Sequence, residues 1–252
     1  MYNEEDLSLL DAEDNLESPL DQMAAVDDPA VEAAKPDVEE MLQLLDSPDV
    51  SQRMLAARAF CELQDPRAIP RLIQLLSDAC PLIRVSAAYA LGRNPSDRAV
   101  LPLMHQFDQD WNGYVRKGVV WALGNCQDGR VVASLVDALQ NDISAVRLWA
   151  ASSLGQLAEV AVDVAKTAIP PVIHALRTET VAPVRSNCAW SLGQLSQVVA
   201  TGDIYEQAVK AMIDALSDQD LGVQEDAKSA LLKLSDPHGL QAIEELESIG
   251  LL

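Results

Sequence analysis

One short pattern recurs along this chain at a nearly regular spacing. An arginine is followed eight residues later by a glycine, with mostly small residues between them. The pattern occurs as RVSAAYALG from Arg84, RKGVVWALG from Arg116, RLWAASSLG from Arg147 and RSNCAWSLG from Arg185. Weaker copies begin at Arg53 and Gln224, and successive copies are 31 to 39 residues apart. A helix-like apolar segment precedes each copy, so the repeat predicts an all-α solenoid of tandem two-helix units.

The repeat divides the chain into an array and an N-terminal arm. We expect six units, at about 36–64, 65–94, 95–126, 127–160, 161–198 and 199–234. A final amphipathic helix, with Leu240, Ile243, Leu246 and Ile249 on its apolar face, is expected to cover the open end. Residues 1–35 hold eleven acidic residues and one lysine. We expect them to form a disordered acidic arm before a solenoid at 36–252.

The repeat glycine can either end its helix or allow a neighbouring helix to approach closely. In LGRNPSD, residues 91–97, we expect Gly92 to end its helix. After Gly155 and Gly193 the apolar pattern continues, which favours close helix packing there. Insertions near 158–168 and 197–206 explain the wider spacings and predict longer helices or a longer loop.

The paired motifs resemble those of HEAT-repeat proteins, specifically the phycobilisome lyase HEAT-like type. Val-Arg or Ile-Arg pairs begin the second helices, and Leu-Gly pairs follow. An acidic residue stands six positions before the anchor at Asp78, Asp110, Glu179 and Asp218. The resemblance implies a buried ladder in which these acids pair with arginines of neighbouring repeats. The aromatic Y/W-x-x-W-W-L-G segment of bilin lyase subunits is missing from the first repeat, RMLAARAFCEL.

A row of aromatic and amide residues marks the face of the second helices opposite the core stripe. Counted from the anchor arginine, positions two, five and nine share this face. Rings and amides together suit capture of an extended peptide or a flat ligand. The alternative is that the rings pack sideways against neighbouring second helices. The predicted binding residues are Tyr89, Arg93, Trp121, Asn125, Trp149, Gln156, Asn187, Trp190 and Gln194.

The net charge of the chain limits the kinds of partner that it can bind. The net charge is −21, which disfavours nucleic acid and anionic membrane and favours a basic protein surface, unless the charge serves solubility alone. No apolar run is long enough for a transmembrane helix, and the acidic N-terminus does not resemble a secretory signal. We therefore expect a cytoplasmic protein without membrane insertion.

Other candidate residues are weaker. Cys80 is the expected exposed thiol and a weak metal-ligand candidate, whereas Cys126 and Cys188 occupy core-facing positions. Trp111 is expected to cap locally, with an exposed patch shared with Tyr114 as the alternative. No catalytic constellation or phosphate loop is visible, so no catalytic residue and no cofactor are assigned.

Two functions remain open at this point. The first is a non-catalytic adaptor for a protein partner, with an iron–sulfur scaffold protein as one version suggested by similar HEAT proteins. The second is a phycobilin lyase subunit or chromophore chaperone of phycobiliprotein maturation. In that alternative the bilin is a transient ligand and Arg93 a candidate for its propionate. We favour the adaptor, which leaves enzymatic activity undecided but disfavoured.

Overall fold

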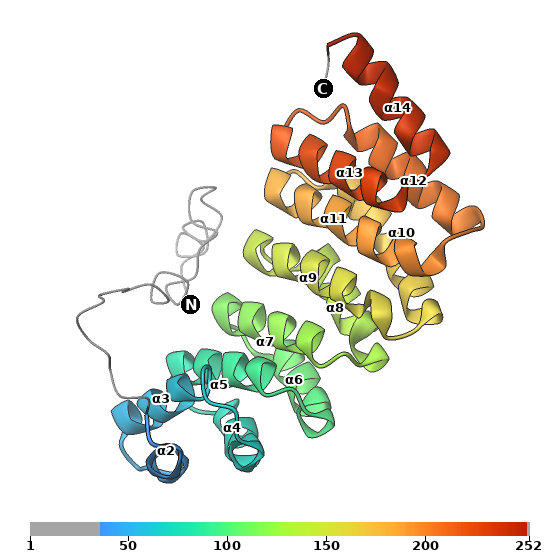
Figure 1. The fold of residues 1–252 in the computed structure, drawn as a ribbon. Helices are drawn as coiled ribbons and strands as arrows, with labels where there is room; N and C mark the ends of the chain where they lie inside the picture. The colour runs from blue at the N-terminus through green and yellow to red at the C-terminus, as the bar shows by residue number, and fades with distance from the viewer. Residues whose placement is uncertain (1–35, 251–252) are drawn as a thin grey trace. The chain divides into compact units, whose positions relative to one another are not determined.

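The computed structural model describes residues 36–250, and the predicted arm at 1–35 lies outside the described residues. All regular structure in this range is helical (Figure 1). The α-helices are α2 (Val38–Leu44), α3 (Val50–Ala59), α4 (Ile69–Leu75), α5 (Pro81–Arg93), α6 (Asp97–Gln109), α7 (Gly113–Asn125), α8 (Val132–Asn141), α9 (Ser144–Gln156), α10 (Val162–Thr178), α11 (Ala182–Val199), α12 (Asp203–Ala215), α13 (Leu221–Leu234) and α14 (Pro237–Ser248). The predicted pairs and terminal helix are therefore confirmed.

The chain forms two compact units that divide inside α7. In the N-terminal unit, residues 36–122, α2 packs on α3, α4 on α5, α3 on α5 and α4 on α6. In the C-terminal unit, residues 123–250, the second helices α9, α11 and α13 pack in one layer, and the first helices α8, α10 and α12 in another. Helix α14 packs on α12 and α13. Each unit is therefore a two-layer stack of helix pairs.

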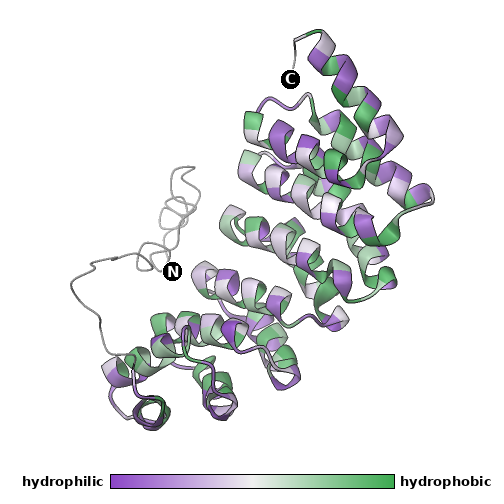
Figure 2. Cartoon of the chain, viewed as in Figure 1, coloured by the Kyte–Doolittle hydropathy of each residue, from purple (hydrophilic) through white to green (hydrophobic). Residues whose placement is uncertain are grey.

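Local sequence explains where several helices begin. Asp49 precedes α3 and accepts a hydrogen bond from the Gln52 N–H at 2.9 Å, and Asp220 caps α13 in the same way. These side chains satisfy N–H groups that have no partner within the helix. Hydrophilic and hydrophobic residues alternate around the helices, as expected for helices that bury one face (Figure 2).

Gly92 does not end its helix, and that expectation was wrong. Helix α5 continues to Arg93, and among the described glycines only Gly202 and Gly250 have positive φ. A Cβ atom on Gly92 would lie 2.5 Å from Cζ3 of Trp121. Gly92 is required because the next second helix packs its tryptophan into this space.

Close packing is confirmed at the other two glycines. A Cβ atom on Gly155 would lie 2.7 Å from Cζ3 of Trp190, and one on Gly193 would lie 2.7 Å from the Cβ of Ala230. The contacts join positions on successive second helices. The repeat glycine therefore sets how closely those helices approach.

The insertions lengthen helices, as predicted. Helix α10 has 17 residues and α11 has 18. On the terminal helix, Ile243 is buried and Leu240 and Leu246 are half-buried. Ile249 was wrongly placed on the apolar face: it is 66% exposed and lies after α14 has ended at Ser248. Within residues 36–250, no helix combines the length and apolar character needed to cross a membrane.

Candidate functional site

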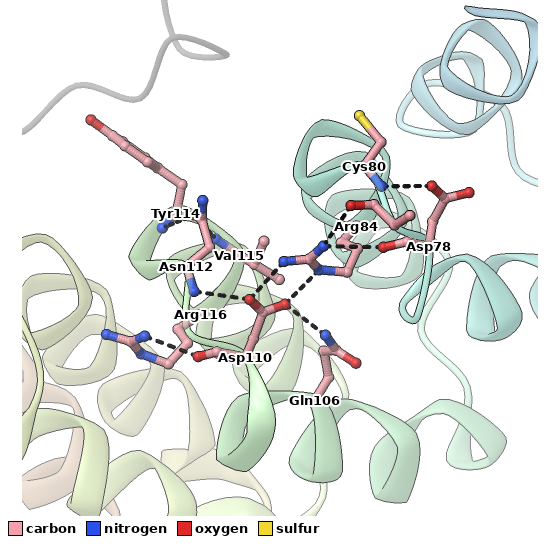
Figure 3. A network of polar contacts seen from close by, with 10 residues as sticks. Asp78, Cys80, Arg84, Gln106, Asp110, Asn112, Tyr114, Val115 and Arg116 are labelled. Atoms are coloured by element: carbon pink, nitrogen blue, oxygen red, sulfur yellow. Dashed lines mark hydrogen bonds and ion pairs between the residues drawn. The ribbon is translucent and has the colours of Figure 1, made fainter. Parts of the chain in front are cut away.

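A ladder of ion pairs positions the second helices that carry the predicted site. In the N-terminal unit, Arg84 donates through two nitrogens to the carboxylate of Asp110, at 2.7 and 2.9 Å (Figure 3). Arg84 also donates to the carbonyl of Asp78, in the turn of its own repeat. The side chains of Arg84 and Asp110 are 9% and 1% exposed. This pair therefore joins two successive repeats from inside the protein.

The same pairing recurs in both units. Arg53 pairs with Asp78 at 2.9 Å, Arg147 with Glu179 at 2.6 Å, and Arg185 with Asp218 at 2.7 Å. Gln224 has no positive charge and instead donates to the Asp218 carbonyl at 2.6 Å. These contacts confirm the ladder that the resemblance implied.

Electrostatics favour the ionised form of the buried acids. Burial by itself would raise the pKa of Asp110, but hydrogen bonds from Arg84, the Asn112 N–H and Gln106 hold the pKa below its usual range. The pKa of Glu179 is lowered in the same way, chiefly by Arg147 against the effect of burial. The ladder residues therefore stabilise the scaffold and hold the second helices in register.

In the N-terminal unit, the predicted site residues Tyr89 and Trp121 lie against each other, and Arg93 lies on the same helix as Tyr89. The Tyr89 and Trp121 rings are half-buried, with centroids 5.2 Å apart and planes at 41°. Tyr89 lies over Gly118, just as Trp121 lies over Gly92. Arg93 is exposed and its Nε donates to the Cys61 carbonyl at 3.1 Å.

In the C-terminal unit, the predicted residues are half-buried on α7, α9 and α11, and they comprise Asn125, Trp149, Gln156, Asn187, Trp190 and Gln194. Trp190 packs over Gly155. Asn187 donates from Nδ2 to the Leu148 carbonyl at 3.0 Å. The Oε1 atom of Gln156 is buried without a hydrogen-bond partner. The Asn187 amide group therefore serves a contact between the second helices α11 and α9.

One side of the Trp121 ring packs against Gly92, and one side of the Trp190 ring packs against Gly155. Both side chains remain partly exposed. The rings therefore contribute to the scaffold and still offer a surface. Binding through these residues stays a prediction.

Two exposed leucines share the second-helix surface and were not among the predicted site residues. Leu55 is 57% exposed and Leu82 is 58% exposed. Leu55 occupies position two of its repeat, the same position as Trp149. Leu82 lies two residues before its anchor arginine, one helical turn before position two. Their helical register could have identified them.

The Trp111 capping role was wrong. Trp111 is 76% exposed, and the start of α7 is capped by Asn112, whose Oδ1 accepts from the Tyr114 and Val115 N–H groups (Figure 3). The indole of Trp111 carries no oxygen acceptor, whereas Asn112 does. Tyr114 is half-buried on the same turn.

The cysteines occupy different environments. Cys188 is buried as predicted, whereas Cys126 is half-buried and not part of the core. Cys80 is half-buried, and its N–H donates to Asp78 at 2.8 Å (Figure 3). In residues 36–250, no three His, Cys, Asp or Glu side chains gather in a way that could hold a metal ion.

Two open hollows lie away from the predicted residues. The first, of about 640 Å³, is lined by α8 and α10 residues that include Val136, Pro170 and His174. The second, of about 670 Å³, lies beside α12 and the start of α14 and includes Tyr205 and His238. Neither hollow is lined by a residue of the predicted surface.

The comparisons with known proteins agree with this architecture. The structure is similar to the complex of CpcE and CpcF of phycocyanin lyase from Nostoc sp. PCC7120, with a TM-score of 0.62 and 21% identity over 87% of this chain and 85% of that chain. It is also similar to a designed armadillo repeat protein in complex with the peptide (KR)4, with a TM-score of 0.54 and 19% identity over 79% of this chain and 100% of that chain. Identities this low show the fold alone.

The sequence itself gives the family. No curated protein matches the chain. A family model described as HEAT repeats matches residues 38–118 and 100–193, more than half of the chain. Together with the paired helices and the arginine ladder, this match shows that the chain belongs to the HEAT-repeat family.

Proposed function

We propose that this protein is a non-catalytic adaptor that binds an extended segment of a partner protein on its second helices. The observation that carries the proposal is the recurrence of half-exposed rings beside polar side chains, repeat after repeat. Tyr89 and Trp121 belong to the N-terminal unit, and Trp149 and Trp190 to the C-terminal unit.

The chemistry of these side chains suits a polypeptide. An indole offers a large contact area at a small cost in conformational entropy. Amide groups can donate to and accept from the backbone of an extended chain. Gln194 is half-buried and lies four residues after Trp190 on the same helix, so it is one such group in the C-terminal unit.

Charge supports a basic partner for the C-terminal unit. Residues 123–252 hold 17 acidic and 8 basic residues, a net charge of −9. A solenoid of similar fold, the designed armadillo protein, was solved with a peptide of alternating lysine and arginine. Neither observation bears on an iron–sulfur scaffold protein as the partner.

A defined peptide tests the proposal without depending on an unknown partner. A peptide selected from a random library on the full chain is titrated against variants by calorimetry. We expect Trp149→Ala to weaken binding by about 30-fold, equivalent to about 2 kcal/mol. Gln194→Ala should weaken it by about fivefold, about 1 kcal/mol for a lost hydrogen bond.

The matched control is Gln140→Ala, which removes an exposed amide from the first helix α8. It should leave the affinity unchanged. If all three variants bind the peptide as the parent does, the second-helix surface is not the binding site and the proposal fails. Circular dichroism of each variant separates loss of binding from loss of fold.

The bilin alternative rests on the likeness to CpcE and CpcF, which extends to the fold alone. Adding phycocyanobilin to the full chain and recording its visible spectrum tests it directly. A red-shifted, structured band at one bilin per chain would contradict a purely protein-binding adaptor. An unchanged spectrum would argue against the chromophore role.

A further inference from the structure

One face of the N-terminal unit combines exposed leucines with arginines. Leu55 and Arg58 are exposed on α3, and Leu82 and Arg93 are exposed on α5. Leu55 and Arg58 lie three residues apart, and Leu82 and Arg93 lie eleven apart, so each pair shares one helix face. Because α3 packs on α5, the two pairs lie on neighbouring helices. We call these four residues the leucine–arginine face.

Each of the two arginines lies in the last turn of its helix. Burial raises the pKa of the Cys61 thiol to about 11, although the charges of Arg58 and Arg93 both favour its thiolate. Arg58 stands three residues before Cys61 in the chain, in the last turn of α3. Arg93 also bonds the Cys61 carbonyl, which holds it over the end of α3.

The acidic residues of this unit are largely engaged elsewhere. Asp78 and Asp110 belong to the ladder. On the first-helix side, Asp46 pairs with Arg71, and Asp65 with Arg67. Glu62, one turn after Arg58, is the acid that adjoins the leucine–arginine face. In a chain of net charge −21, this face is apolar and basic.

The chain contains a segment of complementary chemistry. Residues 1–35 carry a net charge of −10, and the stretch EEDLSLLDAED places Leu7, Leu9 and Leu10 among carboxylates. The segment joins the array at Pro36, directly before α2 of the same unit. Fully extended, 35 residues reach at most roughly 120 Å, so reach does not limit contact with α3 and α5.

We propose that residues 1–35 dock on the leucine–arginine face of their own chain. The leucines at 7–10 cover Leu55 and Leu82, and the adjoining carboxylates face Arg58 and Arg93. Tethering raises the local concentration of the segment to the millimolar range, so modest contacts suffice. Residues 36–122 have a net charge of only −2, from 11 acidic and 9 basic residues, whereas the C-terminal unit at −9 repels the segment.

This inference stands without the proposed function, because the occupant belongs to the chain itself.

Photo-crosslinking in the full-length chain tests the docking. The photoreactive residue p-benzoylphenylalanine replaces Leu9, and the dilute protein is irradiated and digested for mass spectrometry. We expect cross-links within one chain to peptides from 51–62 and 82–93. Arg58→Glu with Arg93→Glu should lower their yield by about tenfold, and 0.5 M salt should lower it as well.

The matched control reverses two arginines on the first helices, Arg71→Glu and Arg98→Glu, with the same change in net charge. It should leave the cross-links unchanged. If the R58E/R93E protein does not fold by circular dichroism, R58Q/R93Q keeps side-chain donors at both positions and gives the same comparison. Cross-links to the C-terminal unit, cross-links between chains, or a yield indifferent to the Arg58 and Arg93 changes would each overturn the proposal.

Discussion

The two units are built on one packing scheme and present different side chains to the outside. Both contain bidentate arginine–carboxylate pairs, Arg84 with Asp110 and Arg185 with Asp218. Both contain a tryptophan packed over the glycine of the preceding second helix. The N-terminal unit nevertheless exposes leucines and arginines, whereas the C-terminal unit places amides around Trp190. Packing constrains the inner positions, which leaves the outward positions to specify what is bound.

The strongest test of the shared scheme removes a ladder acid. Asp110→Ala should lower the free energy of unfolding by about 3–5 kcal/mol, because Arg84 is then left buried without its partner. Asp218→Ala should cost less, because Arg185 and Asp218 are each 14% exposed while Asp110 is 1% exposed. Urea unfolding followed by circular dichroism measures both.

Asp108→Ala is the control, since Asp108 is exposed on the same helix as Gln106 and precedes Asp110 by two residues. It should change stability by less than about 0.5 kcal/mol. Equal losses for Asp108→Ala and Asp110→Ala would show that the ladder does not carry the stability assigned to it.

Acid should weaken the same ladder in both units. The pKa values of Asp110, Glu179 and Asp218 are lowered in the folded protein. Their stabilisation is therefore complete above the unfolded pKa of about 4 and is lost as pH falls through the lower folded values. Asp110→Asn should unfold with a shallower pH dependence below pH 4. An unchanged acid slope in that variant would contradict the assignment.

The contact between glycine and tryptophan predicts a smaller effect that both units share. Gly155→Ala should destabilise by about 1–3 kcal/mol because its Cβ would clash with Trp190. In a Trp190→Ala background the cost should fall, giving a coupling energy of at least about 0.5 kcal/mol. Gly92→Ala and Trp121→Ala should show a similar coupling energy.

Gly222→Ala provides the control, because the nearest atom to its added Cβ is Oδ1 of Asp220 at 3.1 Å. Its destabilisation should be smaller than that of Gly155→Ala, because no tryptophan lies in the space that the added Cβ would take. Coupling at Gly155 without coupling at Gly92 would break the equivalence of the two units.

The smallest predicted effect concerns the end of the C-terminal unit. The Tyr205 hydroxyl donates to Asp236 at 3.0 Å, and Asp236 caps α14. Tyr205→Phe should cost about 1 kcal/mol. Burial and the Asp236 hydrogen bond raise the pKa of Tyr205 to about 12, so its stabilisation is complete below pH 10 and is lost as pH rises toward 12.

Alkaline unfolding of the parent and of Tyr205→Phe measures this difference. The variant should lose less stability than the parent between pH 10 and 12. Parallel curves would show that the Tyr205–Asp236 contact does not anchor α14.

Much of the scaffold was predictable because its residues repeat. The anchor arginines and the acids six positions before them recur in the sequence, and the resemblance to HEAT repeats implied that they pair as a ladder. The inserted residues lengthened α10 and α11, which is one of the two outcomes that the wider repeat spacing predicted. The exposed Leu55 and Leu82 were left out of the predicted site, although helical register places both on the second-helix surface.

The sequence by itself determined the repeat, the number of helix pairs and the uneven distribution of charge, because each depends on residue type and local spacing. Only the tertiary structure decided why Gly92 is a glycine and how far the tryptophans are buried. Gly92 meets Trp121 from the following repeat, 29 residues later in the chain. Local periodicity shows which way a side chain points from its own helix. It does not show which atom of a neighbouring helix already occupies that space.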